Sequence, residues 1–368
     1  MVRVTTLPAA FANQIFDIGR WISGFYSPME MNLFRLLLFM SLVCIACSNQ
    51  HAYGEEAPSS LPRCEAVPLG NGAVSLRIDG REIVRWNSGQ EEVGRKAHFF
   101  PVKSPNGADL TRMGHPGAPN HDHHRSLWWA HHDVDGENFW LEGKEASIVQ
   151  KQWLAYSDGD QARMAVTLGW NQGDRELMEQ ELVAEVSPAP GGGALLEIQT
   201  TFRPSADEVA LGKTNFGFLG IRMAKSISNH FGGGEIKDSE GRVGEKAIFG
   251  KQARWMDYSG SVWVGEGPSR KAAIGGVTWF DHPDNPRYPT HWHVRSDGWM
   301  GASFCFAEPT VIKKGEVLSL RYLFHLRDSA YDKTRAEEIA QSFGAAKGLN
   351  VEKSRKPHLA YEIHRLVK

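Results

Sequence analysis

The chain has 368 residues, of which 41 are lysine or arginine and 43 are aspartate or glutamate, and its net charge is −2 with neutral histidines. Neither sign of charge forms a long run, so the sequence gives no reason to expect nucleic acid as a partner. The length is sufficient for one large domain or two modest ones, each with a hydrophobic core.

Residues 1–54 differ from the rest, and we predict an N-terminal extension followed by a secretory signal peptide. The segment from Met31 to Gly54 has a polar start with Arg35, an apolar run over residues 36–46 and a small-x-small triplet at its end. That run is too short to span a bilayer comfortably, and no later run approaches the ~20 apolar residues that a membrane helix needs. We therefore expect an exported protein, periplasmic or secreted, with no integral membrane span in its mature form.

The cysteines leave two questions open. Cys47 follows a small residue at the end of the apolar run, so lipoprotein anchoring at Cys47 is the alternative to cleavage after Gly54. Cleavage leaves Cys64 and Cys305, which an exporting compartment permits to form a disulfide. Two cysteines are too few for a cysteine-rich zinc site.

Residues 55–350 predict a single large antiparallel β-sandwich, an all-β fold with few helices. Short runs bounded by Gly, Asn, Asp or Pro recur, and several alternate apolar and polar side chains with a period near two. Many short strands and few helical patterns favour antiparallel sheets over βαβ units. The Gly-rich segment 187–193 is predicted to be a hairpin tip. The clearest predicted strands cover residues 73–78, 82–86, 162–170, 194–202, 272–280 and 319–326.

The best helical pattern covers residues 334–346. Thr334 and Glu337 resemble a capping box, and residues 336–343 carry an apolar stripe with helical spacing. Residues 351–368 are predicted to form a charged C-terminal tail on the surface.

Histidines are concentrated in one segment, because six of the chain's 15 lie between His115 and His132. Six imidazoles beside Arg125, Asp122 and Asp133 would be costly to bury as packing alone, since apolar side chains fill a core better. A single histidine is more often a loop or core residue satisfied by hydrogen bonds. The cluster as a whole predicts a functional site.

Two His-x-His pairs are candidates to converge on one ligand. If its segment is extended, His121 and His123 project to the same side, ~7 Å apart, whereas His124 points elsewhere. His291 and His293 repeat this spacing.

Two chemistries are open for these residues. Imidazole changes charge near neutral pH, so acid/base chemistry on a polar substrate is favoured, with an aspartate such as Asp133 or Asp135 holding a histidine tautomer. The alternative is a divalent metal on one His-x-His pair, which His131, His293 or Asp133 would complete, although no HExxH motif occurs. The candidate catalytic residues are His121, His123, His124, Arg125, His131, Asp133, His293 and Arg295.

Tryptophans and arginines near the histidines are candidates for substrate binding. Extended residues 125–132 would place Trp128 and Trp129 on opposite faces, so that one face is buried and the other lines a cleft. Tryptophans stack on the apolar faces of sugar rings, and arginines bind carboxylates or hydroxyls. Ordinary sheet core is the competing interpretation of each tryptophan. The candidate substrate-binding residues are Trp128, Trp129, Arg222 and Trp292.

The motifs around the histidines also carry a family resemblance. They are residues 121–128, continued by 131–136 and 139–140, with 100–102, 104–107, 216–222, 281–286 and 292–295. This combination resembles a family of planctomycete-type bacteria labelled "methane oxygenase PmoA", and it covers most of residues 99–327. A methane monooxygenase subunit is a membrane protein, whereas this chain has only the predicted leader.

The resemblance implies a galactose mutarotase-like β-sandwich in which a histidine and a carboxylate face each other across an open sheet. On that analogy, His123 or His131 is the acid and Asp133 or Asp281 is the base. The chain departs from the expected pattern just before residues 217–222, where it has Asn215 and Phe216 rather than an acidic residue. This departure leaves the identity of the base open.

We therefore expect an exported, carbohydrate-active protein that binds or acts on a small-molecule or glycan substrate, as an epimerase, hydrolase or lyase. A metal-dependent enzyme and a non-catalytic glycan-binding module are the two alternatives.

Overall fold

The computed structural model describes residues 61–90, 95–118, 121–141, 143 and 145–367. The predicted signal peptide and Cys47 lie outside these residues. The residues from Pro62 to Lys368 form the second of two units of the chain, and the structure below is that of this second unit. Within the described ranges, no helix has both the length and the apolar character that crossing a membrane requires.

β-Strands dominate the second unit, with a few short helices and one longer helix. The strands are β1 (Cys64–Pro68), β2 (Val74–Ile78), β3 (Arg81–Asn87), β4 (His98–Val102), β5 (Leu127–His131), β6 (Ala146–Ser157), β7 (Ala162–Gln172), β8 (Arg175–Pro188), β9 (Ala194–Pro204), β10 (Glu208–Leu211), β11 (Gly217–Arg222), β12 (Glu235–Asp238), β13 (Trp255–Val264), β14 (Lys271–Asp281), β15 (Trp292–Arg295), β16 (Trp299–Ala302), β17 (Thr310–Lys313), β18 (Leu318–Arg327), β19 (Leu349–Lys353) and β20 (Tyr361–Arg365). The helices are α3 (Asn229–Gly232), α4 (Glu245–Ile248) and α5 (Lys333–Ala345), with 3-10 turns at Gly70–Gly72 and Gly267–Ser269.

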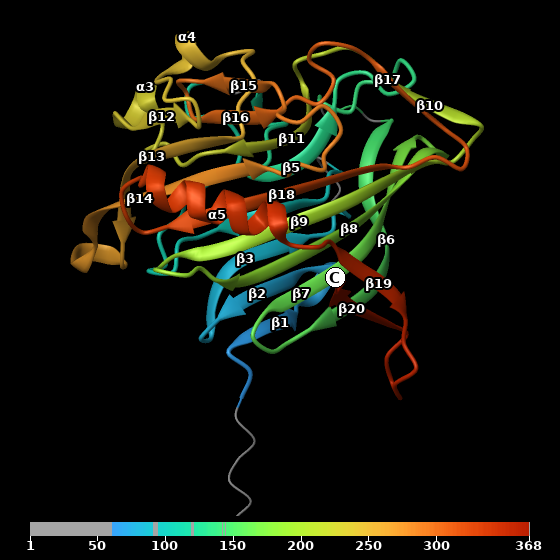
Figure 1. The fold of residues 1–368 in the computed structure, drawn as a ribbon, viewed down its shortest axis with the longest axis horizontal. Coiled ribbons are helices and arrows are strands. Elements are labelled where there is room, and N and C mark those ends of the chain that lie inside the picture. The colour runs from blue at the N-terminus through green and yellow to red at the C-terminus, as the bar shows by residue number, and fades with distance from the viewer. Residues whose placement is uncertain (1–60, 91–94, 119–120, 142, 144, 368) are drawn as a thin grey trace, which may run out of the picture. The chain divides into compact units, whose positions relative to one another are not determined.

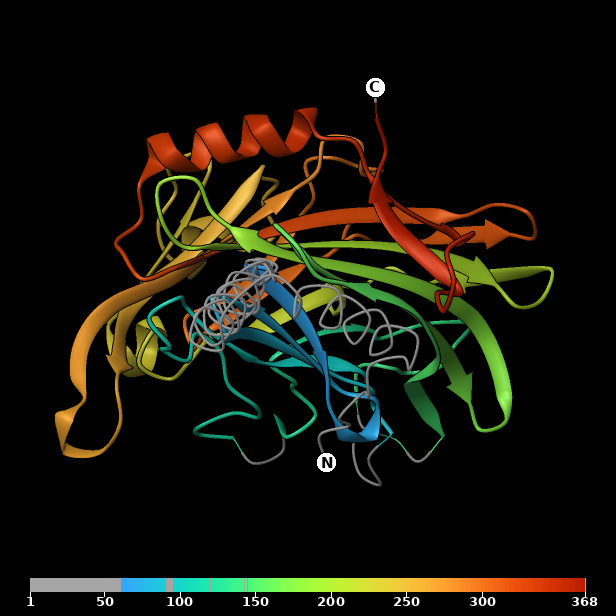
Figure 2. The same ribbon diagram turned by 90° about the horizontal axis from the view of Figure 1, so that it is seen from below.

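Two eight-stranded sheets form the layers of a sandwich (Figures 1 and 2). The first sheet has the order β1-β2-β3-β4-β5-β11-β16-β15, and the second has the order β12-β13-β14-β18-β9-β8-β7-β6. Two small pairs, β10-β17 and β19-β20, complete the strands. Neighbouring strands pair antiparallel, for example β5 with β11 and β14 with β18. The structure therefore confirms the predicted all-β sandwich.

The core lies between the two sheets and is rich in aromatic side chains. Trp129 of β5 in the first sheet lies with its ring centroid 5.4 Å from Phe202 of β9 and 6.0 Å from Tyr322 of β18, both in the second sheet. All three are at most 2% exposed. Each such side chain contributes roughly 1.5–3 kcal/mol of hydrophobic stabilisation, so these contacts hold the layers together.

The predicted strands are present with their ends within two residues of the prediction, as β2, β3, β7, β9, β14 and β18. Residues 187–193 connect the long strands β8 and β9, as predicted for a hairpin tip. Gly191, Gly192 and Gly193 all have positive φ there, a conformation that L side chains rarely adopt.

Helix α5 lies on the outer face of the second sheet (Figure 2). Its apolar stripe packs against Trp255, Phe280 and Leu323, as the spacing predicts. The predicted start is wrong by one residue, because Asp332 caps the helix and accepts hydrogen bonds from the backbone N–H groups of Thr334 and Arg335.

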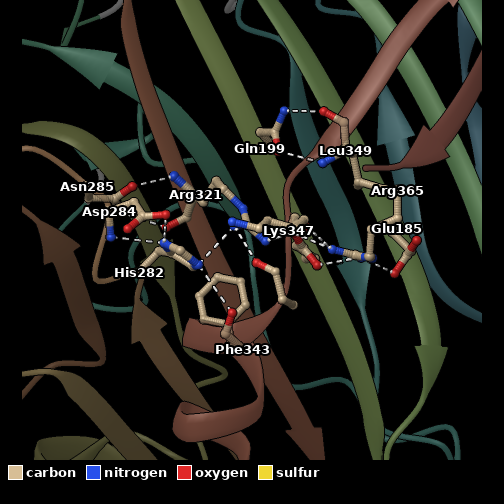
Figure 3. Close-up of polar contacts among 12 residues, drawn as sticks. Glu185, Gln199, His282, Asp284, Asn285, Arg321, Phe343, Lys347, Leu349 and Arg365 are labelled. Carbon is tan, nitrogen blue, oxygen red and sulfur yellow. Dashed lines mark hydrogen bonds and ion pairs between the residues drawn. The ribbon is translucent and has the colours of Figure 1, made fainter. Parts of the chain in front are cut away.

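The charged segment after residue 350 contains more structure than the predicted tail. Strands β19 and β20 form a hairpin whose Leu349 and Ile363 are buried against Ala165 and Val183 of the second sheet. Arg365 of this hairpin bonds to carboxylates of β8 and β9 (Figure 3). Both Cys64 and Cys305 are buried and free, so the permitted disulfide is not formed.

Candidate functional site

Aromatic residues form a separate buried cluster on the outer face of the first sheet. Trp128 of β5 and Trp299 of β16 lie with ring centroids 5.2 Å apart. Trp140 packs edge-on against Trp299 at 5.1 Å, and Phe216 borders the cluster. We call the set His124, Trp128, Trp140, Phe216, His293 and Trp299 the histidine–tryptophan patch.

Two glycines let the Trp299 indole lie flat across the sheet. A Cβ added at Gly220 of β11 would lie 2.1 Å from Cη2 of Trp299, and one added at Gly301 would lie 2.9 Å from Cζ2. Contacts this short are not tolerated, so both positions require glycine while the ring stays in place. The missing side chains at Gly220 and Gly301 leave room for the indole against the sheet. We call the rings of Trp128, Trp140 and Trp299 the aromatic floor.

A turn gathers the first histidine segment instead of extending it. The His124 N–H donates to the His121 carbonyl at 3.1 Å, and the ring centroids of His123 and His124 are 4.4 Å apart. His121 lies 5.5 Å from His123 and 5.0 Å from His124. The expectation that His124 points away from the other two is wrong, because the backbone turns where an extended chain was assumed. His115 adds a fourth ring, 5.3 Å from His121.

His124 anchors this turn on the aromatic floor. Its ring stacks on Trp299 at 5.6 Å and lies 5.6 Å from Trp128, and the residue is 6% exposed. Burial, followed by the charge of Arg222, lowers the pKa of His124 far below its usual range. The imidazole is therefore neutral at physiological pH, and its buried Nδ1 has no hydrogen-bond partner among the residues that the structure describes.

His293 of β15 reaches the same floor from the second histidine segment. Its ring lies 5.8 Å from Trp299 and 5.2 Å from Phe216. The Nδ1 atom must donate to the Asn215 carbonyl at 2.9 Å, so Nε2 carries the free lone pair. Burial lowers the pKa of His293 to about 4, which keeps the ring neutral.

The two distant segments therefore meet at Trp299, and the patch holds unsatisfied polar atoms. Within the described part of the chain, buried nitrogens without a hydrogen-bond partner include Nδ1 of His124, Nε2 of His293 and Nε1 of Trp128 and Trp299. Buried polar groups in folded proteins are nearly always bonded, so each exception calls for an explanation. A ligand whose polar atoms meet these nitrogens would provide one.

A charged group borders the patch. Arg222, which is 1% exposed, donates two hydrogen bonds to Asp297 at 2.8 and 3.1 Å. The Gly117 N–H donates to Nδ1 of His115, so Nε2 of His115 carries the proton and donates to Asp297 at 2.9 Å. Burial raises the pKa of Asp297, but the bonds from Arg222 and His115 outweigh it, and the net pKa is lowered.

Three predicted site residues lie between the sheets instead of at the patch. Trp129 and Trp292 are core residues at 2% and 0% exposure, and His131 is fully buried with its ring 5.0 Å from Phe218. Side chains alternate along a strand, so Trp129 and His131 face the core because Trp128 faces outward. The interpretation of these three as residues of a shared cleft does not fit their positions.

The remaining predicted residues make other contacts. Asp133 accepts a hydrogen bond from the Gly136 N–H, and Arg295 is paired with Glu245 at 2.9 Å on the exposed side of β15. Arg125 is half-buried beside the histidine turn, and its charge adds to the burial that lowers the pKa of His98 to about 4.

Asp281, the other base implied by the family resemblance, is buried under a loop. Its carboxylate accepts hydrogen bonds from Asn285 and the Thr290 N–H. Burial raises the pKa of Asp281 to about 7. No contact joins Asp281 to the patch within the described residues.

A family model described as a family of unknown function, DUF6807, matches residues 73–341. The chain belongs to this family. A search of the curated proteins finds no match. The DUF6807 match includes every residue of the histidine–tryptophan patch and the Arg222–Asp297 pair, so the patch lies in the part of the chain that defines the family.

The close imidazoles do not form a metal-binding geometry in this DUF6807 structure. Among the residues it describes, no group of three or more His, Cys, Asp or Glu side chains is placed to hold a metal ion. The divalent metal therefore stays a hypothesis for experiment.

Several residues of the site were not among the candidate catalytic and substrate-binding residues. Asp297, Trp140 and Trp299 lie near predicted residues in sequence, but their roles depend on pairing across strands. Trp299 pairs with Arg222 in the β11–β16 register, and the Arg222–Asp297 pair spans 75 residues. The available signal was the pair Gly220 and Gly301, which marks a close approach to the sheet face.

Proposed function

We propose that the chain is an exported, carbohydrate-active protein that binds a sugar or glycoside at the histidine–tryptophan patch and acts on it by acid/base chemistry. The observation that carries the proposal is the set of unpartnered nitrogens on an aromatic floor. Indole N–H groups and imidazole lone pairs are the donors and acceptors that sugar hydroxyls need, and aromatic faces suit the apolar faces of sugar rings.

The protonation states support a role for the imidazoles as hydrogen-bond acceptors. His124 and His293 flank Trp299, and both are neutral because burial lowers the pKa of each. A group with so low a pKa is a weak base, but the lone pair of a neutral imidazole accepts a hydrogen bond from a substrate hydroxyl. His115 and Asp297, 2.9 Å apart, supply the histidine–carboxylate pair that a mutarotase-like site would use.

Access to the patch is from its rim. His123 and His124 are 8% and 6% exposed, whereas His121 and Phe216 are half-buried and the Asp297 side chain is 30% exposed. A ligand therefore contacts the more exposed rim first and the buried nitrogens afterwards.

The test is calorimetric titration of the purified protein with a panel of monosaccharides and glycosides, followed by assays for turnover. His293→Phe removes the free lone pair and keeps an aromatic ring, so we expect about a tenfold weaker affinity, the effect of one hydrogen bond. His364→Phe, on an exposed hairpin strand, is the matched control and should bind as the wild type does. Equal affinity in both variants would remove His293 from the site.

A metal-dependent enzyme is the second candidate. The rings of His121, His123 and His124 lie within 5.5 Å of one another, although among the described residues they are not arranged to hold an ion. Metal analysis of protein purified without a histidine tag decides it. Stoichiometric metal that is lost in a His123→Ala variant supports this candidate, and substoichiometric metal with intact activity rejects it. Saturable sugar binding without turnover would instead identify a glycan-binding module.

A further inference from the structure

The charged group beside the patch contains two guanidinium groups and one carboxylate. Arg112 donates to the carbonyls of Gly114 and Asp297, the latter at 3.2 Å, and its own N–H bonds to the Arg222 carbonyl at 3.0 Å. Arg112 and Arg222 are therefore held side by side around Asp297.

The only carboxylate of this group is already occupied. Both oxygens of Asp297 accept from Arg222, and one also accepts from His115. In the described portion of the chain, no carboxylate forms an ion pair with Arg112. Asp109, three residues before Arg112, pairs with Lys103 at 2.8 Å, and Asp122 is exposed and forms no ion pair with Arg112 among the described residues.

The remaining neighbours do not supply a negative charge. The Tyr258 hydroxyl bonds to the Ser296 carbonyl at 2.9 Å, and burial raises its pKa, so the phenol stays neutral. His115 and His124 are neutral because burial lowers the pKa of each. Two cations and one anion leave the group with a surplus positive charge.

The surplus charge is partly shielded from water, which makes it costly. Burial, followed by repulsion from Arg222, lowers the pKa of Arg112 to about 9, so the group is still protonated at neutral pH. The Nε atoms of Arg112 and Arg222 are both buried and have no hydrogen-bond partner in the described part of the chain. A buried cation without a counter-ion is destabilising, and an anion bound there would relieve the cost.

The charged group is continuous with the patch. The N–H of Gly114, two residues after Arg112, donates to the His124 carbonyl at 2.8 Å. The His115 ring, bonded to Asp297, lies 5.3 Å from His121. A ligand over the patch can therefore present a charged substituent to Arg112.

We infer that the patch binds an acidic sugar. The carboxylate of the sugar binds at Arg112, and the sugar ring lies on the aromatic floor. The inference rests on the proposed function and specifies the substrate class of the same site. Guanidinium groups recognise carboxylates through paired N–H donors, so a uronic acid fits this edge better than the corresponding neutral sugar.

The experiment compares matched sugars by calorimetric titration at low salt: glucuronate with glucose, and galacturonate with galactose, with acetate as the carboxylate alone. We expect the uronate to bind at least tenfold more tightly than its neutral counterpart, and the preference to shrink as NaCl is raised. The Arg112→Gln variant should lose the preference while keeping the affinity for the neutral sugar.

Arg77→Gln is the control, because Arg77 of β2 also lacks an ion pair in the described residues and bonds only to Ser75. It should keep the preference. Uronate and neutral sugar binding equally would overturn the inference and leave the proposed function standing, whereas binding of neither would overturn both. If Arg112→Gln does not fold, the uronate-to-neutral ratio of the wild-type protein and its salt dependence decide.

Discussion

The two outer faces of the sandwich both carry buried polar groups, but they satisfy them differently. On the second sheet, Glu185 of β8 and Glu197 of β9 lie between the arginines Arg163, Arg321 and Arg365, and each carboxylate oxygen accepts a bond at 2.6–2.8 Å. Figure 3 shows Glu185, Arg321 and Arg365 of this network. On the first sheet, the histidine–tryptophan patch keeps unpartnered imidazole and indole nitrogens. The first arrangement stabilises the fold, and the second leaves hydrogen-bonding capacity for a ligand.

The hollow on the second face shows why shape alone does not locate chemistry. A pocket of about 370 Å³ lies beside α5 and is lined by apolar side chains together with Glu185, Glu197 and Arg365. Those charged groups are already paired with one another, so they have little hydrogen-bonding capacity for a ligand. The histidine–tryptophan patch on the first sheet has more unpartnered hydrogen-bonding atoms among the described residues.

The largest expected effect is on the second face. Glu197→Ala removes the only carboxylate that pairs with Arg321 among the described residues. This leaves a buried cation uncompensated, and we expect the free energy of unfolding to fall by about 3–5 kcal/mol. Asp79→Ala breaks an exposed pair with Arg63 and should cost less than about 1 kcal/mol. Urea denaturation of both variants measures the difference, and similar losses would mean that the network is no more important than a surface pair.

The next effect is pH dependence, to which both faces contribute. Burial lowers the pKa of His293 on the first face and of His325 on the second to about 4. Because these values lie below the unfolded value of about 6.5, the stabilisation is complete above pH ~6.5 and is lost as the pH falls toward 4, by up to roughly 3 kcal/mol per group. Urea denaturation between pH 7.5 and 5 should show the decline. His293→Phe and His325→Phe should each flatten it, and an unchanged slope would show that the replaced ring does not titrate with unfolding.

A smaller effect is the change in stability when a buried histidine is replaced, which should differ in direction between the two faces. His282 under α5 accepts from the Asp284 N–H at 3.0 Å and contacts Arg321 and the Phe343 carbonyl, so His282→Phe should cost about 1–3 kcal/mol. His124→Phe removes an unpartnered buried nitrogen and should leave stability within about 1 kcal/mol of wild type or raise it. Sugar affinity should change in the opposite order, because only His124 belongs to the patch. Thermal unfolding and titration of the same two samples test both statements.

The smallest effect concerns the start of α5, which covers the second face. Asp332→Ala removes the side chain that accepts from the N–H groups of Thr334 and Arg335, and we expect a loss of about 1 kcal/mol. Thr334→Ala lies inside the helix and should cost less than the cap. Equal losses of unfolding free energy in denaturant would indicate that Thr334 caps the helix, as the sequence pattern predicted.

Much of the fold was predictable because strand and helix patterns are local. Period-two alternation located β9 and β18, and the spacing of Ala336, Ile339 and Phe343 located α5, since each pattern depends on residues close in the chain. The turn at His121 was missed for a related reason. A run of histidines has no strong preference for strand or turn, so the extended geometry assumed for it had no local support.

The sequence by itself determined that the chain forms antiparallel sheets, and that histidines and tryptophans gather in one segment beside β5. Only the tertiary structure decided which face of β5 points outward, because alternation gives two faces without saying which one meets the second sheet. It also decided that His124 and His293 share Trp299 and that Arg222 binds Asp297, because these contacts depend on strand register between segments 75 or more residues apart. Such pairings follow from how the whole sheet closes and leave almost no trace in any short stretch of sequence.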